Sequence, residues 1–321
     1  MSEYRTSRWM RWINAAENLI LFFIISLSFY IVQPVATKQT LHIPHGSIGG
    51  IIAQLTKEGY ELSPIDRYFM RFIGSPKEGD IFLGKRSMNR IDFLQKLTSS
   101  KAVIHKITLI PGETLVIFFD SLAQKYDLNA TKLLSYYHTY SPYPEAGISA
   151  DTYFVPSGIK EKNLIKFLVR ESEKRYKKMA TKAFGDYNTT KWQEVLTVAS
   201  IIQKEAANNK EMPIVASVIY NRLKKRMRLQ MDGTLNYGKY SHQRVTPQRI
   251  KEDKTTFNTY KHRGLPTSPI GAVSRTAINA ALHPAKTDYL YFMKNKKTGA
   301  HDFSKDFKSH RKNIQKAKVA R

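Results

Sequence analysis

A single carboxylate interrupts the apolar side of a predicted helix in the segment ASIIQKEAANN, residues 199–209. Val198, Ile201 and Ile202 recur at three- and four-residue spacing, which is typical of a core-facing helical stripe. Glu205 continues this series near the end of the helix, so it is expected on the core-facing side. Burial and the negative end of the helix dipole would both raise the pKa of its carboxyl. A carboxyl that is protonated near neutral pH is what general-acid cleavage of a glycosidic bond requires.

Two other interpretations of Glu205 stay open from the residues alone. The following stretch AANNKEMP is typical of a helix end, so the helix can fray there and leave Glu205 in water. Alternatively, Glu205 belongs to a hydrolase with two carboxylates, in which Asp232 is the second.

Other kinds of catalytic site find little support in the sequence. It has no cysteine, no HExxH, no GxSxG and no Gly-rich phosphate loop. Its nine histidines form no pair at four-residue spacing, and the neighbours His301 and Asp302 alone are a weak indication of a metal. We therefore predict neither a metal site nor a cofactor.

The helix that carries Glu205 is predicted to begin at Lys191, with Thr190 as its N-cap. Before it, a long basic amphipathic helix is expected over 160–183, and 141–159 is expected to be a loop because it contains three prolines and two glycines. The long helix either packs on the domain with a solvated charged face or binds a polymer.

The region before these helices contains a similar pattern twice. The stretches that begin near 41 and near 107 each predict strand, turn, helix, turn and helix, with Ser47 and Thr114 at the start of the first helices. Two copies indicate two small α/β units, since a solenoid needs at least three. The expected fold class is therefore mixed α+β.

The N-terminal region contains a predicted membrane span over 13–35, which is long enough to cross a bilayer. Basic residues and two tryptophans precede it: Arg5, Arg8, Arg11, Trp9 and Trp12. The positive-inside bias puts residues 1–12 in the cytoplasm and everything after Pro34 outside. The alternative is a cleaved signal peptide.

The chain is strongly basic, with 52 Lys and Arg against 26 Asp and Glu and a formal net charge of +26 in 321 residues. Such an excess predicts an anionic partner. Because the predicted topology puts the basic bulk outside the cytoplasm, we expect an anionic membrane surface or an acidic polymer, and no nucleic acid.

Four blocks of sequence together resemble the MltG/YceG-like family of endolytic murein transglycosylases. They are PEAGISADTYFVPSG, then ASIIQKEA with VASVIYNRLKKRMRLQMDGTLNYG, then TTFNTYKHRGLPTSPIGAVSRTAINAALHPAKTDYLYF, and last GAHDFSKDFKSHRKN. The order and spacing of the blocks carry the resemblance, which covers the chain from about Pro44 to its end.

The resemblance implies an architecture and a set of site residues. The architecture is a transmembrane helix, a LysM-like module over 40–105 and a catalytic domain over 106–321. It implies that Glu205 is catalytic and that the substrate-binding residues are Gln230, Asp232, Thr234, Tyr237, Asn258, Thr259, Tyr260 and Glu145. The chain departs from the family pattern at Gln203, Ala206, Gly233 and Ala150, which affects what surrounds and orients Glu205.

The implied reaction cleaves the β-1,4 bond between N-acetylmuramic acid and N-acetylglucosamine in nascent peptidoglycan and leaves 1,6-anhydro ends, which terminates strand elongation. The implied location is the inner (cytoplasmic) membrane, with a single pass and an extracytoplasmic catalytic domain. Expected partners are peptidoglycan glycan strands, anionic membrane and peptidoglycan synthases. The alternative is a non-catalytic scaffold that binds peptidoglycan within the cell-wall synthesis machinery.

Overall fold

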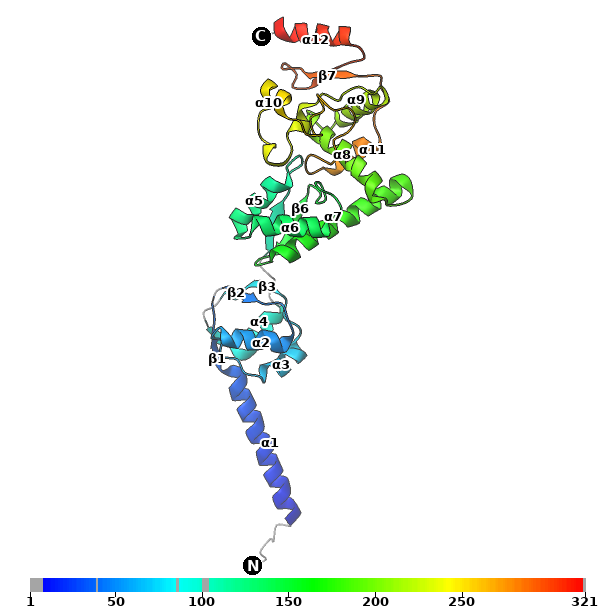
Figure 1. Ribbon diagram of the computed structural model, residues 1–321. Helices are drawn as coiled ribbons and strands as arrows, with labels where there is room; N and C mark the ends of the chain where they lie inside the picture. Colours follow the sequence, from blue (N-terminus) through cyan, green and yellow to red (C-terminus); the bar gives the residue numbers. More distant parts are fainter. Residues whose placement is uncertain (1–7, 39, 85–86, 100–103, 320–321) are drawn as a thin grey trace, which may run out of the picture. The chain divides into compact units, whose positions relative to one another are not determined.

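The computed structural model describes residues 8–38, 40–84, 87–99 and 104–319, and the chain divides into two compact units (Figure 1). The first unit contains the residues up to His105 together with Phe154–Ile159. The second contains Lys106–Tyr153 and Lys160–Arg321. Helices and short strands alternate in both, which confirms the predicted mixed α+β class.

The first unit begins with α1 (Arg8–Val32), whose stretch Trp9–Val32 is long and apolar enough to cross a membrane. Within the described part of the chain it is the one helix of that kind. Its large apolar side chains are not covered by protein, since Leu19 and Phe22 are each 70% exposed. The helix ends before the predicted limit of 35 because Pro34 disfavours helical backbone at the residue before it.

The rest of the first unit, as far as the structure describes it, packs three helices and four short strands around one apolar core. The elements are β1 (Pro34–Ala36), β2 (Thr40–Ile43), α2 (Ile48–Lys57), α3 (Asp66–Ile73), β3 (Gly79–Phe82), β4 (Ser87–Asn89) and α4 (Arg90–Ser99). β1 pairs with β4 and β2 with β3, both antiparallel. As predicted, Ser47 caps α2 by accepting a hydrogen bond from the Gly50 amide.

From residue 104 on, the chain forms β5 (Ile104–Thr108), α5 (Leu115–Tyr126), α6 (Ala130–Tyr140), β6 (Thr152–Pro156) and α7 (Glu161–Phe184). It continues with α8 (Thr189–Glu205), α9 (Met212–Lys224), the short 3-10 helices η1 (Asp232–Leu235) and η2 (Gly238–Tyr240), and α10 (Pro247–Glu252). It then forms α11 (Arg275–Leu282), β7 (Tyr291–Lys294), β8 (His301–Ser304) and α12 (Phe307–Val319). β7 and β8 form an antiparallel hairpin.

Helix α8 forms the centre of the second unit, in contact with α9, α11 and η1. The sequence predicted one apolar stripe, but α8 is buried on nearly all sides between Trp192 and Ile202. Small residues permit this close packing, and Ser200 uses its hydroxyl to bond the Thr197 carbonyl and the Ile270 amide. A helix enclosed in this way is a rigid support for the residue at its end.

The start of α8 differs from the prediction. Asn188, not Thr190, is its N-cap, and the Asn188 side chain accepts a hydrogen bond from the Lys191 amide at 3.0 Å. Thr190 is already helical because Asn188 offers an equally good capping side chain two residues earlier. The long helix α7 lies close to its predicted limits, and it packs its apolar side, including Leu168 and Tyr176, into the core.

Candidate active site

Glu205 is the last residue of α8, as the periodicity predicted. Its side chain is half-buried, and its Oε1 accepts a hydrogen bond of 2.7 Å from the Gly233 amide. Only glycine lets η1 approach this closely, because a Cβ at position 233 would lie 2.8 Å from Glu205 Oε1 and 2.9 Å from Lys204 Cβ. The carboxyl is therefore held on one side by backbone.

The environment of Glu205 favours the neutral form of its carboxyl. Burial raises the pKa of Glu205 to about 7, and the negative charge of Asp232 acts in the same direction. The Gly233 hydrogen bond and the positive charge of Arg222 act in the opposite direction. With a pKa near 7, the group can give a proton and take one back at the same pH.

Arg222 is a buried cation close enough to affect Glu205. It donates to the carbonyl oxygens of Leu290 and Leu229, both at 2.6 Å, and to that of Arg228 at 3.2 Å. Because the guanidinium is bonded to carbonyls, it supplies positive charge near Glu205 from a fixed position.

Asp232 and Tyr260 lie beside Glu205 and bond to each other. The Tyr260 hydroxyl donates to Asp232 Oδ1 at 2.7 Å. Burial and the neighbouring Asp232 raise the pKa of Tyr260, so the phenol stays protonated and remains a donor. Asp232 is exposed and Tyr260 half-buried, so both side chains can be reached by a bound molecule. Gln230 is also exposed, and its backbone is left-handed, with φ of 50°.

Three of the predicted site residues are buried in the loops that carry Asp232 and Tyr260. Thr234 and Asn258 are fully buried, and Thr259 is 1% exposed. The Thr259 hydroxyl contacts that of Thr234 at 2.9 Å and accepts from the Met231 amide. The Asn258 amide donates to two carbonyl oxygens, each at 2.8 Å, and its oxygen accepts from the Tyr260 amide. Their polar groups thus hold the two loops together.

Tyr237 is held in a similar way. Its ring stacks on Phe257 with the centroids 4.3 Å apart, and its hydroxyl donates to Asp253 at 3.0 Å. Polar and aromatic contacts therefore attach residues 232–237 to residues 253–260. These contacts hold Gly233 and Asp232 next to Glu205.

A second group of titratable side chains surrounds Lys204, the residue before Glu205. Lys204 donates to the Asn236 carbonyl and to the Ser241 hydroxyl. Burial lowers the pKa of Lys204 to about 8, although the negative charges of Glu113 and Glu145 act to raise it. Glu113 lies 2.8 Å from His242 Nε2.

Glu145, which the sequence placed among the substrate-binding residues, belongs to this second group. Its Oε1 accepts from the Leu115 amide at 3.2 Å and from the Ala146 amide at 3.3 Å. Burial raises the pKa of Glu145 to about 7, although the amides and Lys204 favour its charged form. It thereby fixes the 141–151 loop to the first turn of α5.

The turn after Glu205 is attached to the β7–β8 hairpin by Glu211. Glu211 accepts from the Ala207 amide at 3.2 Å, and from the His301 amide and Nδ1 at 2.8 and 2.7 Å. Burial opposes ionisation, but these hydrogen bonds keep the pKa of Glu211 below its usual value. Among the described residues no group of three or more potential ligands is arranged for a metal ion, and His301 serves as the partner of Glu211.

Two of the departures noted in the sequence also have structural consequences. Gln203 accepts a hydrogen bond of 3.2 Å from the Ser274 amide, which joins α8 to the start of α11. Ala206 caps the end of α8 and packs on the core.

The sequence identified Gly233 as a departure from the family pattern but did not predict its hydrogen bond to Glu205, and it did not identify Lys204 or Arg222 as neighbours of the site. The Gly233 amide is a backbone group, and it lies 28 positions after Glu205 in the chain. The proximity of Lys204 to Glu205 in sequence was the available signal for the second cluster. Arg222 carried no signal, because an arginine near a helix end is ordinary.

Comparisons with known proteins show the family of the chain. The model of the YceG-like family matches residues 41–316. A Bacillus subtilis protein named endolytic murein transglycosylase is 41% identical over 129 residues, which is 40% of this chain and 36% of that protein. A Streptococcus pneumoniae protein of the same name is 30% identical over 126 residues, 38% of this chain and 23% of that protein. The chain thus matches about a third or less of the length of these relatives.

The fold is also found in a solved structure. The crystal structure of a putative YceG-like protein from Listeria monocytogenes superposes with a TM-score of 0.57 at 26% sequence identity. The match covers 86% of this chain and 99% of that chain.

Proposed function

Because this chain belongs to the YceG-like family, we propose that it is a lytic transglycosylase that cuts peptidoglycan glycan strands within their length. The names of the Bacillus and Streptococcus relatives support this activity. The observation that carries the proposal is Glu205, a carboxyl at the end of a buried helix with a pKa of about 7 and one side held by the Gly233 amide.

The proposed mechanism uses Glu205 as the single acid and base. Protonated Glu205 gives its proton to the glycosidic oxygen between N-acetylmuramic acid and N-acetylglucosamine, and the bond from C1 to that oxygen breaks. The Glu205 carboxylate then takes the proton of the muramoyl C6 hydroxyl, whose oxygen bonds to C1. The products are a 1,6-anhydro end and a free hydroxyl on the departing sugar, and no water is consumed.

The surrounding residues divide into two proposed roles. Gln230, Asp232 and Tyr260 contact the sugars, a role supported by the exposure of Gln230 and Asp232 and by the protonated Tyr260 phenol. The Asp232 charge keeps the pKa of Glu205 raised. Thr234, Tyr237, Asn258 and Thr259 are positioning residues, because their polar groups bond within the protein. Glu145 positions the 141–151 loop.

We further propose that α1 is a single-pass anchor in the cytoplasmic membrane, with the N-terminus inside and the catalytic domain, 106–321, outside. The exposed apolar surface of α1 and the basic and aromatic residues at its start, Trp9, Arg11 and Trp12, support this topology. The module over 40–105 is proposed to be LysM-like and to bind glycan. Anionic lipids and peptidoglycan synthases are the proposed further partners.

Purified full-length protein in detergent, incubated with isolated glycan strands, tests the proposal by the mass of the products. We expect 1,6-anhydro ends with the wild type and none with Glu205→Gln. Ordinary reducing ends would contradict the transglycosylase reaction and indicate a hydrolase with Asp232 as second carboxylate. Binding of glycan without cleavage at any pH would instead support a non-catalytic scaffold.

A further inference from the structure

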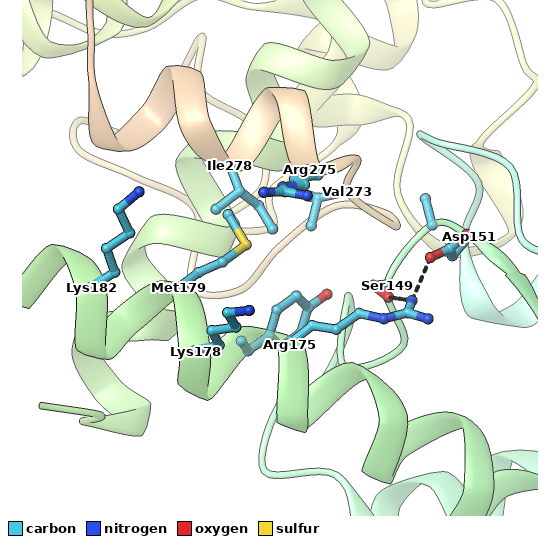
Figure 2. Close-up of a pocket in the computed structure, with 11 residues that line it drawn as sticks. Ser149, Asp151, Arg175, Lys178, Met179, Lys182, Val273, Arg275 and Ile278 are labelled. Atoms are coloured by element: carbon cyan, nitrogen blue, oxygen red, sulfur yellow. Dashed lines mark hydrogen bonds and ion pairs between the residues drawn. The ribbon is translucent and has the colours of Figure 1, made fainter.

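A pocket of about 570 Å³ lies in the second unit between α7 and the start of α11 (Figure 2). We call it the α7–α11 pocket. None of the residues given to the proposed reaction lines it; its walls come from α7, from the 149–151 segment and from 273–278. Its size is within the range that accommodates small organic ligands.

The charged residues of the pocket are mostly basic. Four cations, Arg175, Lys178, Lys182 and Arg275, face one carboxylate, Asp151. Asp151 already forms an ion pair with Arg175, whose Nη1 donates to it at 2.5 Å (Figure 2). Among the described residues, no ion pair is recorded for Lys178, Lys182 or Arg275. Three positive charges around one cavity therefore lack a counter-charge in the described part of the chain.

The pocket also has an apolar part. Met179, Val273 and Ile278 line the pocket among the cations (Figure 2). The buried Tyr176 also lines it. A pocket with both features fits a ligand that carries several negative charges and small apolar groups.

We propose that the α7–α11 pocket binds the acidic peptides attached to the glycan strand, through at least two of their carboxylates and their small apolar side chains. This inference depends on the proposed function, because peptidoglycan is the proposed substrate and its peptides carry free carboxylates. An uncharged sugar would leave the cations unpaired. A phosphate ion would leave Met179, Val273 and Ile278 without contacts.

Hydrogen bonds of backbone amides connect the walls of the pocket to the helix that carries Glu205. Ser274 precedes Arg275, and its amide donates to Gln203 on the same helix as Glu205. On the other side, the Ala150 amide donates to the Val273 carbonyl at 3.1 Å. The 270–275 segment is fixed further by the paired amides of Gly112 and Ala272, each 2.7 Å from its acceptor. The pocket therefore has a fixed position relative to Glu205, which lets it hold a peptide while the strand is cut.

Calorimetric titration of the full chain in detergent tests the binding. The probe is the mixture of short acidic peptides that an amidase releases from purified peptidoglycan. We expect saturable binding that weakens at least about tenfold in the triple variant Lys178→Gln, Lys182→Gln, Arg275→Gln, since charged hydrogen bonds are lost. All three side chains are exposed, so the variant is expected to fold.

Three exposed lysines of α7 that do not line the pocket provide a matched control. The triple variant Lys162→Gln, Lys166→Gln, Lys174→Gln removes the same number of positive charges, all three of them from α7, and we expect it to bind as the wild type does. An equal loss in this variant would overturn the proposal, because it would indicate diffuse attraction. Equal binding of peptides with amidated carboxylates, or displacement of the peptides by an equal concentration of inorganic phosphate, would also overturn it.

A second measurement separates this inference from the proposed reaction. Peptide binding does not require cleavage, so it can be present when the chain proves inactive. If the chain cleaves strands, the pocket variant should have a raised KM on strands that carry peptides, and an unchanged KM on strands stripped by the amidase. An unchanged KM on both, or no binding of the peptides by the wild type, would overturn the assignment.

Discussion

Glu205 and Glu145 are two carboxyls in one unit, and burial raises the pKa of each to about 7. Their hydrogen bonds distinguish them. Both oxygens of Glu145 accept hydrogen bonds from backbone amides, and Lys204 lies close enough to favour its charged form. For Glu205 one donor is recorded among the described residues, the Gly233 amide on Oε1, and its acidic neighbour is Asp232. The comparison teaches that a raised pKa alone does not identify an acid catalyst; it must also have an oxygen left for the substrate.

Substitution of each carboxyl in turn tests this comparison most strongly. Glu205→Gln should lower the rate of anhydro-end formation by at least about 10³-fold, since the proton donor and acceptor is removed. Glu145→Gln should lower it by less than about tenfold, because its amide oxygen can still accept from Leu115 and Ala146. The rate is measured on isolated strands near neutral pH. A Glu145→Gln variant as inactive as Glu205→Gln would remove the distinction.

The pH dependence of stability gives a second test. The pKa of Glu205 is higher in the folded state than the ordinary value, so its contribution to stability is present at low pH and is lost as pH rises through about 7. Glu205→Gln should therefore be more stable than the wild type at pH about 8, by about 1–3 kcal/mol, and about equal at pH about 4. Thermal unfolding of both proteins across this range measures the difference. Greater stability of the wild type at high pH would contradict the assigned pKa.

Removal of the neighbouring acid tests what sets the pKa of Glu205. The wild-type rate should fall above pH about 7 as the proton donor ionises. Asp232→Asn should move this alkaline limb to lower pH, by about 0.5–1 unit, because the negative charge that favours the protonated form is gone. The rate is followed as kcat/KM against pH. An alkaline limb at the wild-type pH would contradict this, because it would show that Asp232 holds the loop in place and does not set the pKa of Glu205.

The opposite shift is expected from the loss of the amide donor. Gly233→Pro removes the N–H that favours ionised Glu205, so the limb should move up by about 0.5 unit. Gly233→Ala is the matched control, since it adds a Cβ against Glu205 Oε1 but keeps the N–H. Equal profiles for the two variants would assign the effect to the Cβ and not to the hydrogen bond.

The sequence predicted the position of Glu205 because helical periodicity is a local property. It predicted the limits of α7 closely for the same reason, but misplaced the start of α8, since Asn188 and Thr190 are both suitable caps. The contacts of Glu205 were not predictable in this way. Gly233 reaches it only because the buried bonds of Thr234, Asn258 and Thr259 fold two distant loops together.

The α7–α11 pocket is a second feature that helical periodicity could not predict. The basic residues of α7 suggested a solvated face or a polymer-binding helix, and periodicity cannot decide between these. What distinguishes Lys178 and Lys182 from the other lysines is the proximity of Arg275 and Ile278, which follow about a hundred positions later in the chain. Such a site becomes visible only when the tertiary structure is known.

The central claim is that Glu205 transfers a proton twice and that no water enters the product. Cleavage of isolated strands in water labelled with heavy oxygen, followed by mass analysis of the new muramoyl ends, tests it most directly. The proposed reaction predicts 1,6-anhydro ends that carry no heavy oxygen. New ends that incorporate the label during cleavage would contradict it.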